Sequence, residues 1–104
     1  MTNENYFQDL TIEQLIFLHL LKFNHQHDDS IVTALITEQG IKNELNCSLG
    51  FVSQLLKKNE DIGYIFRTKS KIVRSRKKQN VFFLTENGLK LAKEIQKMSL
   101  DLKQ

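Results

Sequence analysis

The chain has 104 residues, of which 40% are apolar and 26% charged, and its net charge of +3 fits one folded domain rather than a disordered chain. The longest apolar stretch, residues 15–21, is too short to span a membrane, and residues 1–5 lack the pattern of a signal peptide. The single cysteine, Cys47, excludes an internal disulfide and a zinc-binding cysteine pair, so we expect one cytoplasmic domain over residues 1–104 with no membrane partner.

A first helix is predicted to begin at Thr11. Thr11 and Gln14 have the spacing of a capping box, in which each side chain bonds the other's backbone. The residues that follow, as far as Phe23, are apolar around most of the helix circumference, so this helix must be covered on several sides. Polar residues 24–30 then predict a loop, and residues 31–33 predict a short strand.

Two short helices joined by a tight turn are predicted next. Thr37 is a suitable N-cap for the first, and the second runs over Leu49–Asn59 with Ser48 as its cap. Asn46, between them, tolerates the left-handed backbone that ends a helix. The segment is therefore predicted to be a helix-turn-helix over about residues 37–59.

The apolar pattern then changes to that of strands. Residues 64–66, 72–73 and 81–84 are rich in β-branched and aromatic side chains, which predicts a wing of two or three strands over about residues 64–84. An amphipathic C-terminal helix follows over about residues 86–102. The order helix, strand, helix, helix, strand, strand, helix predicts an α+β, mostly helical fold, the winged helix-turn-helix.

The predicted wing carries most of the positive charge. Residues 67–78 hold seven of the 15 basic residues, whereas all 12 acidic residues lie elsewhere. Such a concentration suits a polyanionic partner, although a charged run on a loop can also be plain solvated surface. The seven cations are Arg67, Lys69, Lys71, Arg74, Arg76, Lys77 and Lys78, and we expect the last four to cluster at the hairpin tip.

Two segments resemble MarR-like winged-helix regulators. Residues 36–65 resemble their helix-turn-helix core, and residues 74–88 resemble their wing, with a basic tip, an aromatic strand and the signature LTE-x-G before the last helix. The resemblance covers about residues 36–95 and extends to the small archaeal-type regulators of that group. It implies a DNA-binding transcriptional regulator. The sequence departs from the family pattern at four positions. Lys42 stands where a small residue is usual, and Asn46 stands where glycine is usual. Gln54 replaces the usual arginine, and Asn59 replaces the usual leucine.

In a winged helix, the second helix of the helix-turn-helix enters the major groove. Its outward polar side chains predict the contacts: the Gln54 amide can pair with adenine, and Ser48 with the first-turn amides suits a phosphate. The wing cations could follow phosphates or insert an arginine into the minor groove. Plain helix surface is the alternative for each helix position. The candidate residues on this helix are Ser48, Gly50, Ser53, Gln54 and Lys57.

The first and C-terminal helices offer more apolar surface than one small core needs. This excess predicts a homodimer formed through these two helices, which would read a palindromic double-stranded DNA target. A protein-interaction module that does not bind DNA is the alternative. RNA binding is a third hypothesis, which the absence of paired exposed aromatic residues disfavours.

No catalytic, metal or cofactor site is predicted. The sequence has no glycine-rich phosphate loop, no nucleophile elbow and no acid pair in a helical or strand context, so we expect no enzyme. His25 and His27 could offer metal ligands, but a solvated loop is the simpler interpretation. His19 is expected to be packed or interfacial, and Cys47 to be a small buried residue.

Overall fold

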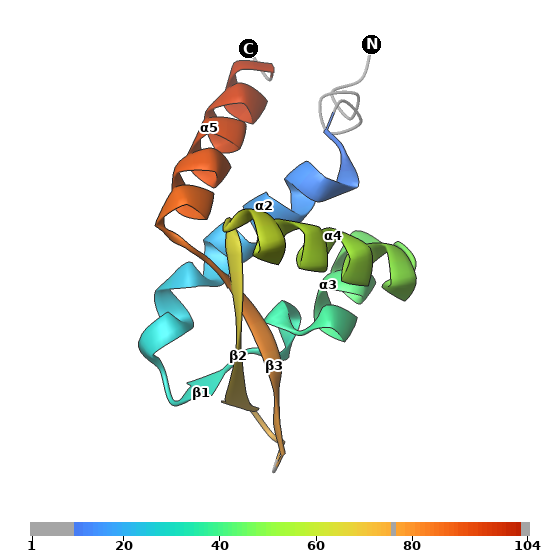
Figure 1. Cartoon of the computed structure of the whole chain (residues 1–104), viewed down its shortest axis with the longest axis vertical. Coiled ribbons are helices and arrows are strands. Elements are labelled where there is room, and N and C mark those ends of the chain that lie inside the picture. Colours follow the sequence, from blue (N-terminus) through green and yellow to red (C-terminus); the bar gives the residue numbers. More distant parts are fainter. Residues whose placement is uncertain (1–9, 76, 103–104) are drawn as a thin grey trace.

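A computed structural model of the chain describes residues 10–75 and 77–102. Over these residues the elements follow one another in the predicted winged-helix order, with two short 3-10 helices (η) added (Figure 1). None of the helices within the described ranges is long and apolar enough to cross a membrane. The elements are α2 (Ile12–Phe23), η1 (Asn24–Asp28), β1 (Ile31–Val32), η2 (Ala34–Ile36), α3 (Glu38–Leu45), α4 (Leu49–Ile62), β2 (Ile65–Ile72), β3 (Lys78–Leu84) and α5 (Glu86–Leu102).

The predicted helix caps are confirmed. Thr11 and Gln14 form the capping box of α2, since each backbone N–H donates to the other's side chain, at 2.9 and 3.1 Å. The hydroxyl of Thr37 accepts from the Gly40 N–H at the start of α3, and that of Ser48 accepts from the Phe51 N–H at the start of α4. These bonds satisfy backbone donors that the first turn of a helix would otherwise leave unpaired.

The helices α3 and α4 both end at a residue in the left-handed conformation. Asn46 ends α3 at φ 54°, the left-handed conformation predicted for it. The end predicted for the second helix, Asn59, is wrong: α4 continues for three more residues to Ile62, and Gly63 ends it at φ 100°. The polar run before Gly63 consists mainly of good helix formers, so the helix stops only where a residue free to adopt positive φ follows.

The sheet has the order β1-β2-β3, with β1 parallel to β2 and β2 antiparallel to β3. β2 is one continuous strand of eight residues, longer than the two apolar fragments that the sequence suggested, because its polar middle is paired along its whole length with β3. Residues 81–84 of β3 are all buried. The hairpin base therefore belongs to the core, and only its outer half projects from the molecule (Figure 1).

The core lies between α2, α4, the hairpin base and α5, and its largest side chains are Phe17, Phe82 and Phe83. The apolar side chains of α2 are buried or half-buried within this one chain. α5 extends away from the sheet, at the end of the molecule opposite the hairpin tip (Figure 1). The hairpin and α5 are thus the two projections from a common core.

The start of α5 is held tightly against the end of α4. The Thr85 hydroxyl donates to the carbonyl of Gly63 at 2.6 Å, and the Thr85 N–H donates to the carbonyl of Tyr64 at 3.0 Å. Gly88 lies so close that a Cβ there would be 1.9 Å from the Tyr64 carbonyl oxygen. This contact gives the LTE-x-G signature a physical reason: a side chain at Gly88 would collide with backbone.

Candidate nucleic-acid interface

The outward face of α4 carries the residues predicted to contact DNA. Ser48, Gly50, Gln54 and Lys57 are all exposed on or beside this helix. Ser53 differs, because it is half-buried and its hydroxyl donates to the Glu38 carboxylate of α3 at 2.8 Å. Four of the five residues predicted to contact DNA are thus exposed to solvent, while Ser53 joins α4 to α3.

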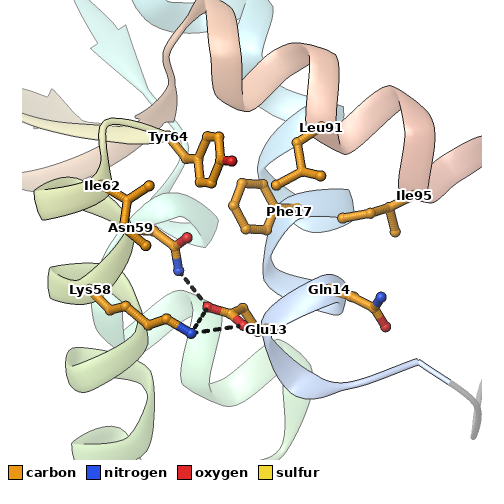
Figure 2. A pocket seen from close by; sticks show the side chains of 9 residues that line it. All are labelled: Glu13, Gln14, Phe17, Lys58, Asn59, Ile62, Tyr64, Leu91 and Ile95. Atoms are coloured by element: carbon orange, nitrogen blue, oxygen red, sulfur yellow. Dashed lines mark hydrogen bonds and ion pairs between the residues drawn. The ribbon is translucent and has the colours of Figure 1, made fainter.

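The last turns of α4 are fastened to α2 (Figure 2). The Glu13 carboxylate accepts from the Asn59 side-chain amide at 2.8 Å and forms an ion pair with Lys58 at 3.1 Å. Asn59 is buried, and its amide also donates to the Leu55 carbonyl at 2.8 Å. The polar Asn59, where the resembling family usually has leucine, is therefore fully compatible with burial.

The environment of Glu13 favours its ionised form. Partial burial by itself raises the pKa of this carboxyl, but the hydrogen bonds from Asn59 and Lys58, with the charge of Lys58, outweigh it and lower the pKa below its ordinary value of 4.5. Glu13 opens onto a pocket of about 260 Å³ between α2, the end of α4 and α5 (Figure 2). Phe17 and Tyr64 meet edge to face there, at 5.8 Å between ring centroids.

Three of the wing cations share one face of the hairpin. Because side chains alternate along a strand, Arg67, Lys69 and Lys71 project from the same face of β2. Lys71 is paired with Lys78 of β3, so two like charges lie directly opposite each other at the outer end of the ladder. Such a pair is unfavourable in the free protein and would be relieved by a bound anion.

Arg67 differs from the other wing cations because it has an acidic partner. Its guanidinium donates to both carboxylate oxygens of Glu60 on α4, at 2.6 and 3.2 Å, and lies 5.5 Å from the centroid of the Phe82 ring. The hydrogen bond with Glu60 raises the pKa of Arg67 above its ordinary value. Arg67 therefore ties the hairpin base to α4 and turns the cationic face of β2 toward that helix.

Arg74, Lys77 and Lys78 lie toward the tip. Arg74 is in the turn with φ 64°, a conformation that side chains other than glycine rarely adopt. Lys77 precedes β3 and Lys78 opens it, while Arg76 lies outside the described residues. Within residues 10–75 and 77–102, none of the exposed cations Lys69, Lys71, Arg74, Lys77 and Lys78 forms an ion pair with an acidic side chain.

The other residues singled out from the sequence have structural surroundings. His19 is buried and its Nε2 lies 2.7 Å from the Leu35 carbonyl oxygen, so it is packed. Cys47 is half-buried against the core, and His27 pairs with Asp28 beside it in the chain. In the part of the chain that the structure describes, no group of three or more His, Cys, Asp or Glu side chains could hold a metal ion.

Two features of α4 were not predicted from the sequence. The hydrogen bond between Asn59 and Glu13 joins residues 46 positions apart, so no local sequence pattern predicts it. Leu49 and Phe51 are exposed in the first turn of α4. For these two a signal did exist, since apolar residues between a serine cap and a polar helix face are unusual on a solvated helix.

No protein-family model and no curated protein matches the sequence. Solved structures do match it. Staphylococcus aureus MepR in complex with DNA is 20% identical, with a TM-score of 0.64 over 97% of this chain and 72% of that one. A second structure of MepR, a transcription regulator of the Staphylococcus aureus multidrug efflux pump MepA, is 23% identical, with a TM-score of 0.59 over 96% of this chain and 65% of that one. AbfR in a disulfide-bonded form is 21% identical, with a TM-score of 0.54 over 95% and 61%.

These likenesses concern the fold. The chain has the winged-helix fold of MarR-type transcription regulators, as the resemblance of its sequence implied. It spans between 61% and 72% of the length of the three structures.

Proposed function

We propose that this chain is a sequence-specific double-stranded DNA-binding protein that regulates transcription as a homodimer. In this proposal α4 enters the major groove, and the β2–β3 hairpin follows the backbone or enters the minor groove. The observation that carries it is the position of Arg67. Because Arg67 reaches Glu60 on α4, the cations on its face of β2 are turned toward the same helix, so that one duplex could meet both.

Each candidate residue has a role in this proposal. Gln54 reads adenine, while Ser48, Gly50 and Lys57 approach the phosphates at the two ends of the exposed face of α4. Ser53 acts by holding α4 against Glu38 of α3, at 2.8 Å. Phosphates are contacted by the wing cations Arg67, Lys69, Lys71, Arg74, Arg76, Lys77 and Lys78, of which Arg67 must share its charge with Glu60.

The homodimer is proposed to form through the first and C-terminal helices, α2 and α5. Support comes from α5, where Met98 and Leu100 are exposed at the end of the molecule away from the hairpin. A dimer joined there would leave both hairpins free (Figure 1). The fold also supports DNA binding by likeness, since MepR was solved in complex with DNA.

The test is a titration of the wild-type protein against random-sequence duplex DNA at several salt concentrations. If each protomer of a dimer contacts about four phosphates, log K should fall with log salt at a slope near −7. The variant Lys69→Ala/Lys71→Ala/Lys78→Ala should show a shallower slope, by roughly 1 unit for each phosphate contact that it removes from each protomer. These lysines are exposed, so the fold should be retained.

A matched control removes the same charge from the other end of the molecule. Lys90, Lys93 and Lys97 are exposed on α5, and their triple alanine variant should keep the wild-type slope. Equal effects of the two triple variants would show that net charge, not the hairpin, attracts DNA. Folded wild-type protein that binds no duplex even at low salt would contradict the proposal and direct attention to a protein partner.

A further inference from the structure

The first turn of α4 presents large apolar side chains to solvent. Leu49 is 41% exposed and Phe51 is 44% exposed, and neither is among the described side chains that pack on the core. Gly50 lies between them, and a Cβ placed there would meet no atom within 4 Å. This end of the helix is therefore an open, uncharged and largely apolar surface.

The helix geometry directs these side chains forward. Side chains on a helix tilt toward its N-terminus, so Leu49 and Phe51 project beyond the end of α4, on either side of Gly50. Gln54 is exposed one turn later, three residues after Phe51, and lies on the same side of the helix. Phe51 and Gln54 thus share one side of α4, while Leu49, about 200° around the helix from Phe51, flanks Gly50 on the other side, at the end that would enter the groove first.

The first two turns of α4 also lack positive charge. Residues 49–56 contain neither lysine nor arginine, the residues that most often recognise guanine. Lys57 and Lys58 come later, and they face Asp61 and Glu13. Lys57 and the hairpin cations can provide affinity for phosphates but little sequence discrimination.

In the major groove, thymine is the only unmodified base that presents a methyl group. An exposed apolar side chain gains free energy by covering that methyl, and an exposed glutamine amide can pair with adenine. The hairpin cations lie beside the opposite end of α4, at Glu60, so a long polyanion such as duplex DNA, rather than an apolar protein surface, could meet both them and this patch. We propose that Leu49 and Phe51 determine specificity by contacting thymine 5-methyl groups, so that α4 selects A·T base pairs. This inference rests on the proposed function.

The experiment begins with selection by the wild-type protein from two pools of short duplexes with a randomised centre. One pool contains thymine and the other contains deoxyuridine, which lacks only the 5-methyl group. The best sequence from the thymine pool is then synthesised with thymine and with deoxyuridine, and both are titrated at one salt concentration. We expect enrichment of A·T pairs and a loss of about fourfold in affinity for each contacted methyl that is removed.

The variant Leu49→Ala/Phe51→Ala separates direct contact from effects on DNA shape. It should bind the thymine and deoxyuridine duplexes with nearly equal affinity, close to that of the wild type for the deoxyuridine duplex. The control Ile31→Ala shortens another exposed apolar side chain, on β1, and should keep the full difference. Circular dichroism checks the fold of each variant; if the double variant does not fold, Phe51→Ala replaces it.

The outcomes are distinguishable. If the wild-type protein binds both duplexes equally, or if the double variant keeps the full difference, the thymine contact is overturned while DNA binding stands. If the wild-type protein binds neither pool at any salt concentration, the proposed function itself fails. If the wild-type protein prefers the thymine duplex, replacing its thymines by deoxyuridine one at a time identifies which methyl groups contribute to the affinity.

Discussion

The side-chain amide of Asn59 on α4 donates a hydrogen bond of 2.8 Å to the carboxylate of Glu13 on α2. The bond joins α4, the helix proposed to enter the major groove, to α2, which packs against α5. It also replaces the apolar contact that a leucine would make at this position. The orientation of α4 therefore depends on a polar pair as well as on the core.

Removing Glu13 should destabilise the protein. Glu13→Ala leaves one N–H of the buried Asn59 amide without its acceptor, and the free energy of unfolding should fall by about 1–2 kcal/mol. Lys58→Ala should lower it by less than about 1 kcal/mol, since Lys58 is largely exposed. Urea unfolding followed by circular dichroism measures both. Adding Asn59→Leu to Glu13→Ala should restore stability; a further loss would show that the pocket does not accept an apolar side chain there.

The same pair should make stability depend on pH in the acid range. Because folding lowers the pKa of Glu13, its contribution is present above the ordinary value of 4.5 and is lost as the pH falls through the lower folded value. Glu13→Gln can still accept from Asn59 but does not titrate. Its urea midpoint should therefore fall less than that of the wild type between pH 5 and pH 3; parallel curves would exclude Glu13 as a source of the dependence.

Two glycines should respond to alanine in opposite directions. Gly88→Ala places a methyl group against the Tyr64 carbonyl, at 1.9 Å before relaxation, and should destabilise the protein by about 2–3 kcal/mol. Gly50→Ala adds a methyl group in open space in the first turn of a helix and should stabilise the protein by at most about 0.5 kcal/mol, less than in a helix interior. Thermal unfolding distinguishes the two. Similar melting temperatures for both variants would contradict the close contact between α5 and the end of α4.

Arg67 and Lys71 should have different effects on stability. Arg67→Ala removes two hydrogen bonds to Glu60 and a contact with the Phe82 ring, so the free energy of unfolding should fall by about 1 kcal/mol. Lys71→Ala removes the repulsion from Lys78 and should leave stability equal or slightly higher. Both should weaken DNA binding. If Lys71→Ala destabilised as much as Arg67→Ala, the long side chain of Lys71 would have a packing role as well.

The sequence alone determined the elements whose signals are local. The Thr11–Gln14 capping box, the Thr37 and Ser48 caps and the left-handed Asn46 were all predicted, because each depends on atoms within a few residues. The spacing of apolar residues then set the order of helices and strands. Signals weakened where polar residues dominate, which is why the middle of β2 and the last turn of α4 were not predicted.

Tertiary structure alone decided which groups meet. Glu13 with Asn59, Ser53 with Glu38 and Arg67 with Glu60 lie on different elements, so each pair exists only once packing has fixed how those elements cross. The same packing decides which apolar side chains stay outside the core, among them Leu49 and Phe51. Hydrogen bonds and apolar contacts act over a few ångströms in space, whatever the separation of their residues along the chain.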